Sequence, residues 1–211
     1  MKEIKFVAGY YEWHLIVDDK LAYVENDSFF DAIPSINGQI LASDLEGSVS
    51  ELVDYIRYRY IENTLEQIED GQYDEVQVKE LQDQIEVIKS LTDEEWQQVE
   101  KVIFKTYGWH YGVRDRRFEY KGFTFEPVGN ILGGWSNRVR HTIYDNNYPT
   151  MTKFDYKDFY KVAKKNHASC DVYRINNSED YYMLNGNIFR KVDLKDYSDF
   201  KTCDSYSKWY Q

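Results

Sequence analysis

The sequence predicts an α+β protein with N-terminal antiparallel strands, an acidic helical bundle and a C-terminal antiparallel β-meander with one short helix. Strand-like alternation and tight turns mark both ends of the 211 residues, whereas helical spacing of apolar residues marks the middle. Charge is divided too, because residues 44–100 hold 17 acidic and 4 basic residues, whereas residues 101–165 hold 13 basic and 6 acidic ones. We therefore expect two domains, 1–108 with the hairpins and acidic helices and 109–211 with the basic, aromatic-rich β half.

The first elements are expected to be strands. Apolar runs that predict strands lie at residues 4–7, 13–17 and 21–24. The polar turn Asp18-Asp19-Lys20 separates the second and third runs and indicates a hairpin. Asn37-Gly38 predicts another tight turn, because both residues tolerate positive φ.

Three helices are expected next, over residues 48–70, 74–90 and 92–105. Ser48 with Glu51, and Thr92 with Glu95, match the capping box that opens many helices. The apolar residues of the first helix fall in two rows rather than one, so this helix should bend or contact two neighbours. The short loops between the helices favour antiparallel packing.

The C-terminal half is expected to return to strands. Residues 117–128 alternate around Lys121-Gly122, and Asn185-Gly186 is a strong hairpin signal within a meander over 170–192. Between them, residues 129–153 are expected to be irregular, and residues 155–165 should form a short basic helix that buries Phe159 and Val162.

Composition limits the cellular setting. Two cysteines, Cys170 and Cys203, make no disulfide framework, which is typical of a reducing cytosol. Charged residues interrupt any signal-peptide pattern at the N-terminus, and no stretch approaches the roughly 18 apolar residues of a membrane span. A pI of about 4.9 disfavours attraction of the whole molecule to DNA or anionic lipid. We expect a cytoplasmic protein without a membrane partner.

The sequence does not indicate a cofactor or a metal. The four histidines are dispersed and the cysteines form no Cys-x-x-Cys pair, so no zinc-site spacing is present. The glycine-rich segment 129–134 lacks the Lys-Ser/Thr ending of a phosphate-binding loop. Neither cofactor nor metal ligands are therefore assigned.

Two residue patterns are compatible with catalysis, and neither is favoured. Glu119-Tyr120-Lys121 matches the Glu-x-Lys of metal-dependent nucleases, with Asp115 as a further carboxylate, but it falls in an expected hairpin tip. Cys170 with His167 could form a nucleophile and base, although a buried, inert Cys170 is the stronger expectation. The protein is expected to be non-enzymatic, and no catalytic residue is assigned.

The acidic helices carry a candidate partner-binding surface. Its residues are Glu62, Glu66, Glu69, Asp70, Asp74, Glu75, Glu80 and Asp83. Like charges three or four residues apart on a helix repel one another, and few cations lie nearby in the sequence. The pattern fits an ordinary solvated face, and it also fits an anionic surface that imitates nucleic-acid phosphates and attracts a basic groove.

An alternative surface lies in the basic segment 109–141. It interleaves aromatic rings with cations at Trp109, Arg114, Arg116, Arg117, Lys121, Trp135, Arg138 and Arg140. Arginine pairs with phosphate and flat rings stack on unpaired bases, so this composition suits RNA or single-stranded DNA. The same arginines could instead neutralise the acidic block within the fold.

Residues 120–127, Tyr-Lys-Gly-Phe-Thr-Phe-Glu-Pro, resemble the YKGY-x-F-x-P hairpin of small accessory proteins of Gram-positive phages, plasmids and conjugative elements. Residues 154–160 and 171–174 are similar to the segment that follows it there, so the resemblance covers about 117–192. It transfers no catalytic residue. It implies a mobile-element setting, which includes anti-CRISPR and anti-restriction proteins.

The expected function combines this setting with the acidic block. We expect a protein that binds and inhibits a host nucleic-acid-targeting defence effector, such as an RNA-guided nuclease, in the cytoplasm of a bacterial host. The alternative is an RNA or single-stranded DNA binding protein, or a metal-dependent nuclease, that uses the basic segment.

Overall fold

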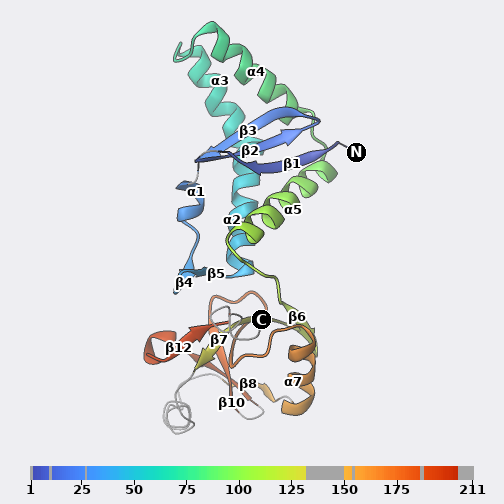
Figure 1. Cartoon of the computed structure of the whole chain (residues 1–211), viewed down its shortest axis with the longest axis vertical. Coiled ribbons are helices and arrows are strands. Elements are labelled where there is room, and N and C mark those ends of the chain that lie inside the picture. Colours follow the sequence, from blue (N-terminus) through green and yellow to red (C-terminus); the bar gives the residue numbers. More distant parts are fainter. Residues whose placement is uncertain are drawn as a thin grey trace. The chain divides into compact units, whose positions relative to one another are not determined.

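A computed structural model describes residues 2–9, 11–26, 28–131, 150–153, 155–185 and 188–203. It confirms the α+β class, with an antiparallel three-stranded sheet, several helices and a C-terminal antiparallel sheet (Figure 1). The chain divides into two compact units, unit 1 (residues 1–34 and 40–113) and unit 2 (residues 35–39 and 114–211). Each unit is described by itself below.

Unit 1 begins with a three-stranded antiparallel sheet in the order β1-β2-β3. Its strands are β1 (Ile4–Ala8), β2 (Glu12–Val17) and β3 (Lys20–Asn26). Asp18 and Asp19 both have positive φ, at 48° and 60°, which confirms the hairpin predicted between β2 and β3. Trp13, Leu15 and Val17 alternate inward along β2, so this strand has one buried face.

The helices of unit 1 follow the sheet. They are α1 (Ser28–Asp31), α2 (Ala42–Asp54), the π-helix η1 (Tyr55–Tyr60), α3 (Ile61–Glu69), α4 (Glu75–Lys89) and α5 (Asp93–His110). The capping box predicted at Thr92 and Glu95 is present at the start of α5. The one predicted at Ser48 is wrong, because α2 already begins at Ala42. The Ser48 hydroxyl instead donates to the Asp44 carbonyl, 3.1 Å away, inside the helix.

The π-helix η1 explains the two apolar rows of the first predicted helix. Elements α2, η1 and α3 follow one another without a break from Ala42 to Glu69. A π-helical turn closes hydrogen bonds between residues five apart rather than four, so it shifts the phase of every later side chain. The π-turn rotates the later apolar row back toward the side of the earlier one, and Ile61 packs against the same core that holds Leu52 and Ile56.

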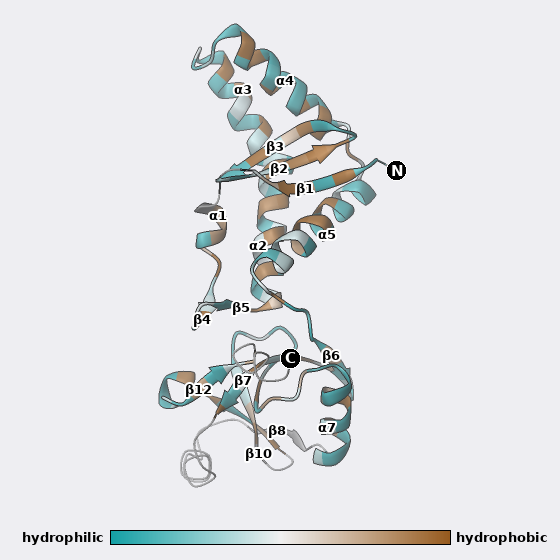
Figure 2. Ribbon diagram, in the orientation of Figure 1, coloured by the Kyte–Doolittle hydropathy of each residue, from teal (hydrophilic) through white to brown (hydrophobic). Residues whose placement is uncertain are grey.

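Among the described residues, the helices of unit 1 share a hydrophobic core with the sheet, and Figure 2 shows the hydrophobic positions of these elements in brown. Tyr107 of α5 is fully buried, and its ring packs against Trp13 of β2, with centroids 4.3 Å apart, and against Phe6 of β1. Leu52 and Ile56 reach the same core from α2 and η1. The sheet therefore supplies one wall of the core, and the helices supply the rest.

A short ribbon pairs β4 (Ser35–Ile36) with β5 (Gln39–Ile40). Between these strands, Asn37 and Gly38 have φ of 52° and 77°, which confirms the predicted turn.

Unit 2 is built on an antiparallel sheet in the order β12-β7-β9-β10-β11-β8, with β6 paired to β7. Its strands are β6 (Phe118–Tyr120), β7 (Phe123–Ile131), β8 (Thr150–Lys153), β9 (Val172–Ile175), β10 (Tyr181–Asn185), β11 (Ile188–Val192) and β12 (Phe200–Thr202). Lys121 and Gly122 have φ of 48° and 79°, which confirms the turn between β6 and β7. The meander β9-β10-β11 is also confirmed, and Asn185 lies opposite Ile188; Gly186 lies outside the described residues.

The irregular segment predicted for 129–153 is partly wrong. Residues 129–131 continue β7 because they pair with β12, and residues 150–153 form β8 because they pair with β11. Residues 132–149 lie outside the described part of the chain. The 3₁₀ turn η2 (Leu194–Asp196) and β12 were not predicted.

The helix α7 (Tyr156–Lys165) completes the core of unit 2. Asp155 caps it by accepting a hydrogen bond from the Asp158 backbone N–H at 3.0 Å. As predicted, α7 buries Phe159 completely and Val162 in part. The centroid of the Phe159 ring lies 5.0 Å from that of Phe125 in β7 and 5.4 Å from that of Tyr173 in β9, so aromatic rings dominate this core.

Among the described residues, no helix has both the length and the apolar character that crossing a bilayer demands.

Candidate acidic binding surface

The helices α3 and α4 form a hairpin whose connection is fixed by hydrogen bonds. Gly71, at φ 70°, ends α3 in a Schellman motif, in which the Gln72 N–H donates to Gln67 and the Gly71 N–H to Ile68. Asp74 opens α4 with a capping box, since its carboxylate accepts from the Gln77 backbone N–H and the Gln77 side chain accepts from the Asp74 N–H. The turn is therefore ordered rather than slack.

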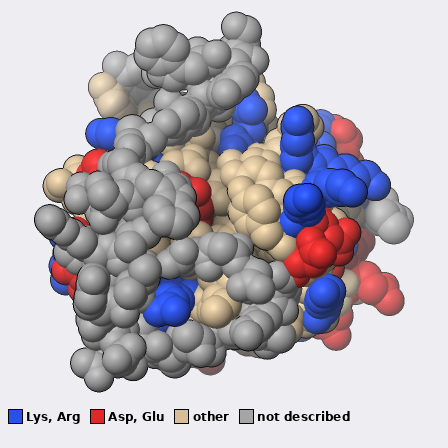
Figure 3. All heavy atoms as spheres, turned by 90° about the horizontal axis from the view of Figure 1, so that it is seen from below, with Lys and Arg blue, Asp and Glu red and all other residues tan. Residues whose placement is uncertain are grey.

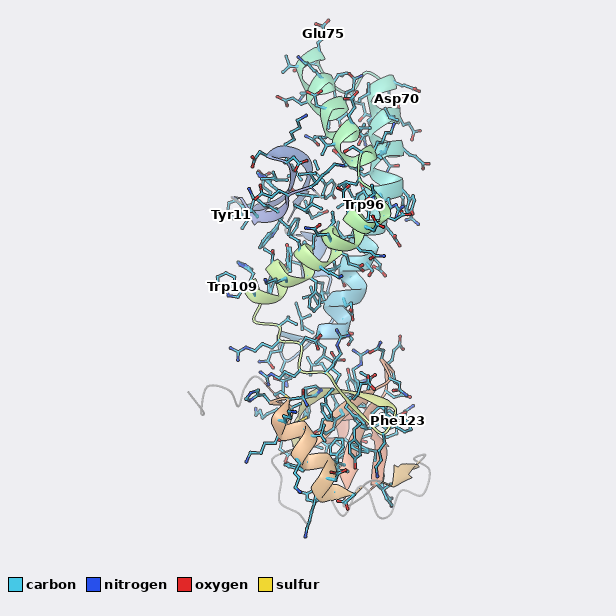
Figure 4. The ribbon with its side chains drawn as sticks, turned by 90° about the vertical axis from the view of Figure 1, so that its right-hand side faces the viewer. Tyr11, Asp70, Glu75, Trp96, Trp109 and Phe123 are labelled. Atoms are coloured by element: carbon cyan, nitrogen blue, oxygen red, sulfur yellow. The ribbon has the colours of Figure 1, made fainter. Side chains whose placement is uncertain are left out.

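We define the acidic hairpin by the eight carboxylates that the sequence singled out on α3, α4 and their connection. They are Glu62, Glu66, Glu69, Asp70, Asp74, Glu75, Glu80 and Asp83, and every one is exposed. Asp70 and Glu75 lie at the free end of the hairpin, where their side chains point away from it (Figure 4). Within the described part of the chain, none of the eight forms an ion pair with a Lys, Arg or His side chain.

Three cations lie close to the acidic hairpin in the sequence. One is paired with a carboxylate outside the hairpin, and the other two are exposed. The Arg57 guanidinium pairs with Asp93 and lies over the Trp96 ring, 5.9 Å from its centroid. Arg59 and Lys79 are exposed, and neither forms an ion pair with a described residue. No ion pair among the described residues therefore offsets the charge repulsion expected along α3.

The spacing of the carboxylates sets what they can imitate. Glu62, Glu66 and Glu69 are four and three residues apart on α3, which places them about 6 Å and 4.5 Å apart along the helix axis. One DNA strand carries a phosphate about every 3.4 Å along its axis. A single helical row is thus less dense than one DNA strand, but α4 adds the carboxylates of Glu80 and Asp83.

A pocket of about 890 Å³ lies beside α4, and part of the acidic hairpin lines it. Glu80 and Asp83 line this pocket together with Lys2 and Lys20 from the sheet. Lys2 bonds Ser90 and Glu95 rather than these two carboxylates. Glu80 and Asp83 therefore remain available to an incoming cation.

The basic segment does not form one described surface. Trp109 is 85% exposed at the end of α5 in unit 1 (Figure 4), whereas Arg114, Arg116, Arg117 and Lys121 belong to unit 2. Trp135, Arg138 and Arg140 lie outside the described residues.

The described cations at the start of unit 2 differ in whether their charges are paired. The Arg117 guanidinium makes two bonds to the Asp115 carboxylate, at 2.8 Å and 2.9 Å, and Lys121 lies 5.4 Å from the centre of the Tyr120 ring. Arg114 is exposed without an ion pair among the described residues. On the face drawn in Figure 3, Lys and Arg gather at one side with Asp and Glu among them. Of the described cations in the segment 109–141, Arg117 is thus paired with a carboxylate, whereas Arg114 forms no ion pair with a described residue.

The Glu-x-Lys match lies at a hairpin tip. Glu119 accepts a hydrogen bond from the Thr124 hydroxyl, and Asp115 is bound to Arg117. Within the described residues, no group of three or more His, Cys, Asp or Glu side chains is placed to hold a metal ion.

Cys170 and His167 do not meet. The Cys170 thiol is 1% exposed and donates to the Val172 carbonyl, 3.0 Å away, while His167 is exposed. Burial raises the pKa of the Cys170 thiol, with a further contribution from Cys203. Cys170 is therefore buried, as the sequence favoured, and it is held in its protonated form.

Sequence reasoning missed a second pocket, lined by Tyr23, Glu25, Tyr55 and Tyr60. The sequence held one indication of this pocket. Tyr23 and Glu25 lie two residues apart on a strand, so their side chains share one face of the sheet. Their proximity to Tyr55 and Tyr60 depends on tertiary packing that periodicity does not show.

No protein-family model, curated protein or solved structure matches this chain.

Proposed function

We propose that the protein is a non-enzymatic inhibitor from a mobile element, which binds a host nucleic-acid-targeting defence effector through the acidic hairpin. The observation that carries this proposal is the set of eight exposed carboxylates that have no ion-pair partner among the described residues. An ordered anionic row attracts a basic nucleic-acid groove over long range and accelerates the encounter. The effector class that fits best is an RNA-guided nuclease, because its nucleic-acid channel is positively charged.

The form of the acidic hairpin supports an interaction role. Leu65 and Val76, which are 39% and 67% exposed, place apolar surface among the carboxylates. Interfaces combine such apolar contact with a charged rim, so the hairpin carries both parts. The Schellman motif and the capping box fix the turn before binding, which reduces the entropy lost on association.

A plasmid-interference assay tests the proposal. Bacteria that carry an active RNA-guided nuclease, or a restriction system in a parallel arm, are transformed with a targeted plasmid while they express the chain. We expect transformation to recover in one arm, and the triple variant Glu62→Lys, Glu66→Lys and Glu69→Lys to lose that recovery. Full recovery by the triple variant, or recovery in neither arm, would contradict the proposal.

A matched control has the same change in net charge at other exposed acids. Asp31→Lys, Glu179→Lys and Asp196→Lys reverse three exposed carboxylates outside the acidic hairpin. This variant should keep the activity of the unmodified chain, because the proposal depends on the position of the charge rather than on its total.

A second candidate function is binding of RNA or single-stranded DNA, and the 85% exposure of Trp109 favours it. The exposed indole of Trp109 offers a stacking platform for an unpaired base. A salt-dependent anisotropy change of labelled RNA on addition of the isolated protein, lost in Trp109→Ala, would support this function. No change at low salt would exclude it and leave the acidic hairpin as the binding element.

A further inference from the structure

The second pocket of unit 1 has the chemistry of a site for an organic cation. It measures about 850 Å³ and opens between β3 and the helical run α2–η1. Ligand pockets in proteins commonly fall between 300 and 1,000 Å³. The pocket thus has room for a small molecule, and its lining decides which kind.

Three tyrosine rings form one wall of the pocket. Tyr23 of β3 meets Tyr60 edge-to-face with centroids 4.9 Å apart, and the Tyr55 centroid lies 6.4 Å from each of the other two. Tyr23 is 4% exposed, whereas Tyr55 and Tyr60 are only half-buried. The buried ring therefore supports the two outer rings, whose surfaces remain accessible.

The π-helix η1 brings the two outer rings together. In an α-helix, residues five apart are rotated by about 140° and face different directions. A π-helical turn repeats at i to i+5, so Tyr55 and Tyr60 fall on one side and both line the pocket. Single π-turns of this kind are frequent at functional sites. The π-helix η1 therefore places both outer rings of the aromatic wall on the pocket.

Carboxylates outnumber cations around this wall. Glu25 contributes from β3 and Glu51 and Asp54 from α2, against the single guanidinium of Arg59. None of the three carboxylates forms an ion pair with a described residue. Glu25 is half-buried, and it accepts hydrogen bonds from the Tyr23 hydroxyl and, at 2.9 Å, from the Asn26 N–H. A half-buried carboxylate held beside rings, with no ion-pair partner among the described residues, can serve as the counter-ion of a bound cation.

Burial supports this description of Glu25. Loss of solvation raises the pKa of its carboxyl, although the hydrogen bonds from Tyr23 and Asn26 oppose that rise. An organic cation in the pocket would offset the cost of this buried charge.

We propose that the pocket binds a small organic cation, an alkylguanidinium or alkylammonium, with its charged head against the tyrosine wall and the Glu25 carboxylate. Cations are attracted to the faces of aromatic rings and pair with carboxylates, and both groups converge here. The proposal does not rest on the acidic hairpin, whose carboxylates line other surfaces.

Isothermal titration calorimetry with ethylguanidinium and with spermidine tests the proposal on the full chain. Ethylurea is the neutral probe of the same shape as ethylguanidinium. We expect at least one cation to bind at micromolar to millimolar concentration, and ethylurea not to bind. Equal binding of ethylurea and ethylguanidinium, or no binding by either cation, would overturn the proposal.

Three variants locate the site. Glu25→Gln should weaken binding about tenfold or more, because it removes the counter-ion and keeps the shape. Tyr55→Phe should retain binding because it keeps the ring, and the exposed carboxylate of α5 changed in Glu94→Gln should have no effect. Unchanged binding by Glu25→Gln, with wild-type circular dichroism, would place the cation elsewhere and overturn the assignment.

Discussion

The Tyr60 hydroxyl donates a hydrogen bond to the Gln84 side-chain oxygen, 3.0 Å away, and so joins the π-helix η1 to α4. This bond connects residues 24 positions apart, and it fixes the base of the acidic hairpin. We expect Tyr60→Phe to lower the free energy of unfolding by about 1 kcal/mol in urea denaturation. Tyr58→Phe is the control. Because the Tyr58 side chain is 56% exposed, removal of its hydroxyl should change the free energy of unfolding little. Equal effects of the two variants would show that the bond contributes nothing.

Glu95 predicts a specific acid sensitivity. The Thr92 backbone N–H, and then Lys2, lower the pKa of its carboxyl from 4.5 to about 2. A carboxylate with a depressed pKa in the folded state stabilises the fold above its ordinary pKa, and this contribution is lost as pH falls toward the folded value. We expect the stability difference between wild type and Glu95→Gln to be full above about pH 5 and to shrink as pH falls toward 2.

Circular dichroism melts at a series of pH values measure this difference. Glu94→Gln is the matched control, since Glu94 is the exposed neighbour of Glu95 on α5. A difference for Glu95→Gln that is constant from pH 6 to about pH 2 would contradict this assignment.

Gly129 predicts a large effect of a single methyl group in unit 2. A Cβ at this position of β7 would lie 2.2 Å from the Lys201 carbonyl oxygen and 2.7 Å from the Phe200 ring. Gly129→Ala must therefore separate β7 from β12, and we expect a loss of about 1–3 kcal/mol. In contrast, Gly47→Ala on α2 meets nothing within 4 Å and should stabilise the protein by about 1 kcal/mol. Calorimetric melts in which both variants shifted the melting temperature in the same direction would contradict the packing described here.

The two cysteines should differ in reactivity. Cys170 is 1% exposed and Cys203 is half-buried, and the pKa of the Cys170 thiol is raised by burial. A thiol reagent reacts with the thiolate, so Cys203 should be modified first in the native protein and Cys170 only as the chain unfolds. The variant Cys203→Ser isolates Cys170. Fast labelling of Cys170 in that variant without denaturant would contradict its burial.

The elements that depend on local sequence were predicted well. Thr92 with Glu95 opens α5 as expected, and Lys121-Gly122 turns β6 into β7, because capping and positive φ are decided within a few residues. Ser48 shows the limit of this approach. Its neighbours match a capping box, but the preceding residues from Ala42 onward are helical, and the Ser48 hydroxyl finds a partner inside the helix.

Long-range relationships could not be predicted from the sequence. Strand β12 forms because Phe200 lies opposite Ile131, and no local pattern around Phe200 indicates that partner. The tyrosine wall likewise joins Tyr23 to Tyr60 across two elements. The exposure of the acidic hairpin followed from helical periodicity, whereas its lack of ion pairs among the described residues depends on tertiary packing.

The central claim is that the acidic hairpin binds a basic surface. The most direct measurement is the rate at which the chain associates with a purified RNA-guided nuclease, followed by surface plasmon resonance at increasing salt. We expect fast association that slows as salt rises, and a loss of about tenfold or more for the Glu62→Lys, Glu66→Lys and Glu69→Lys variant but not for the matched control. Equal association by the two variants, or a rate independent of salt, would contradict the account.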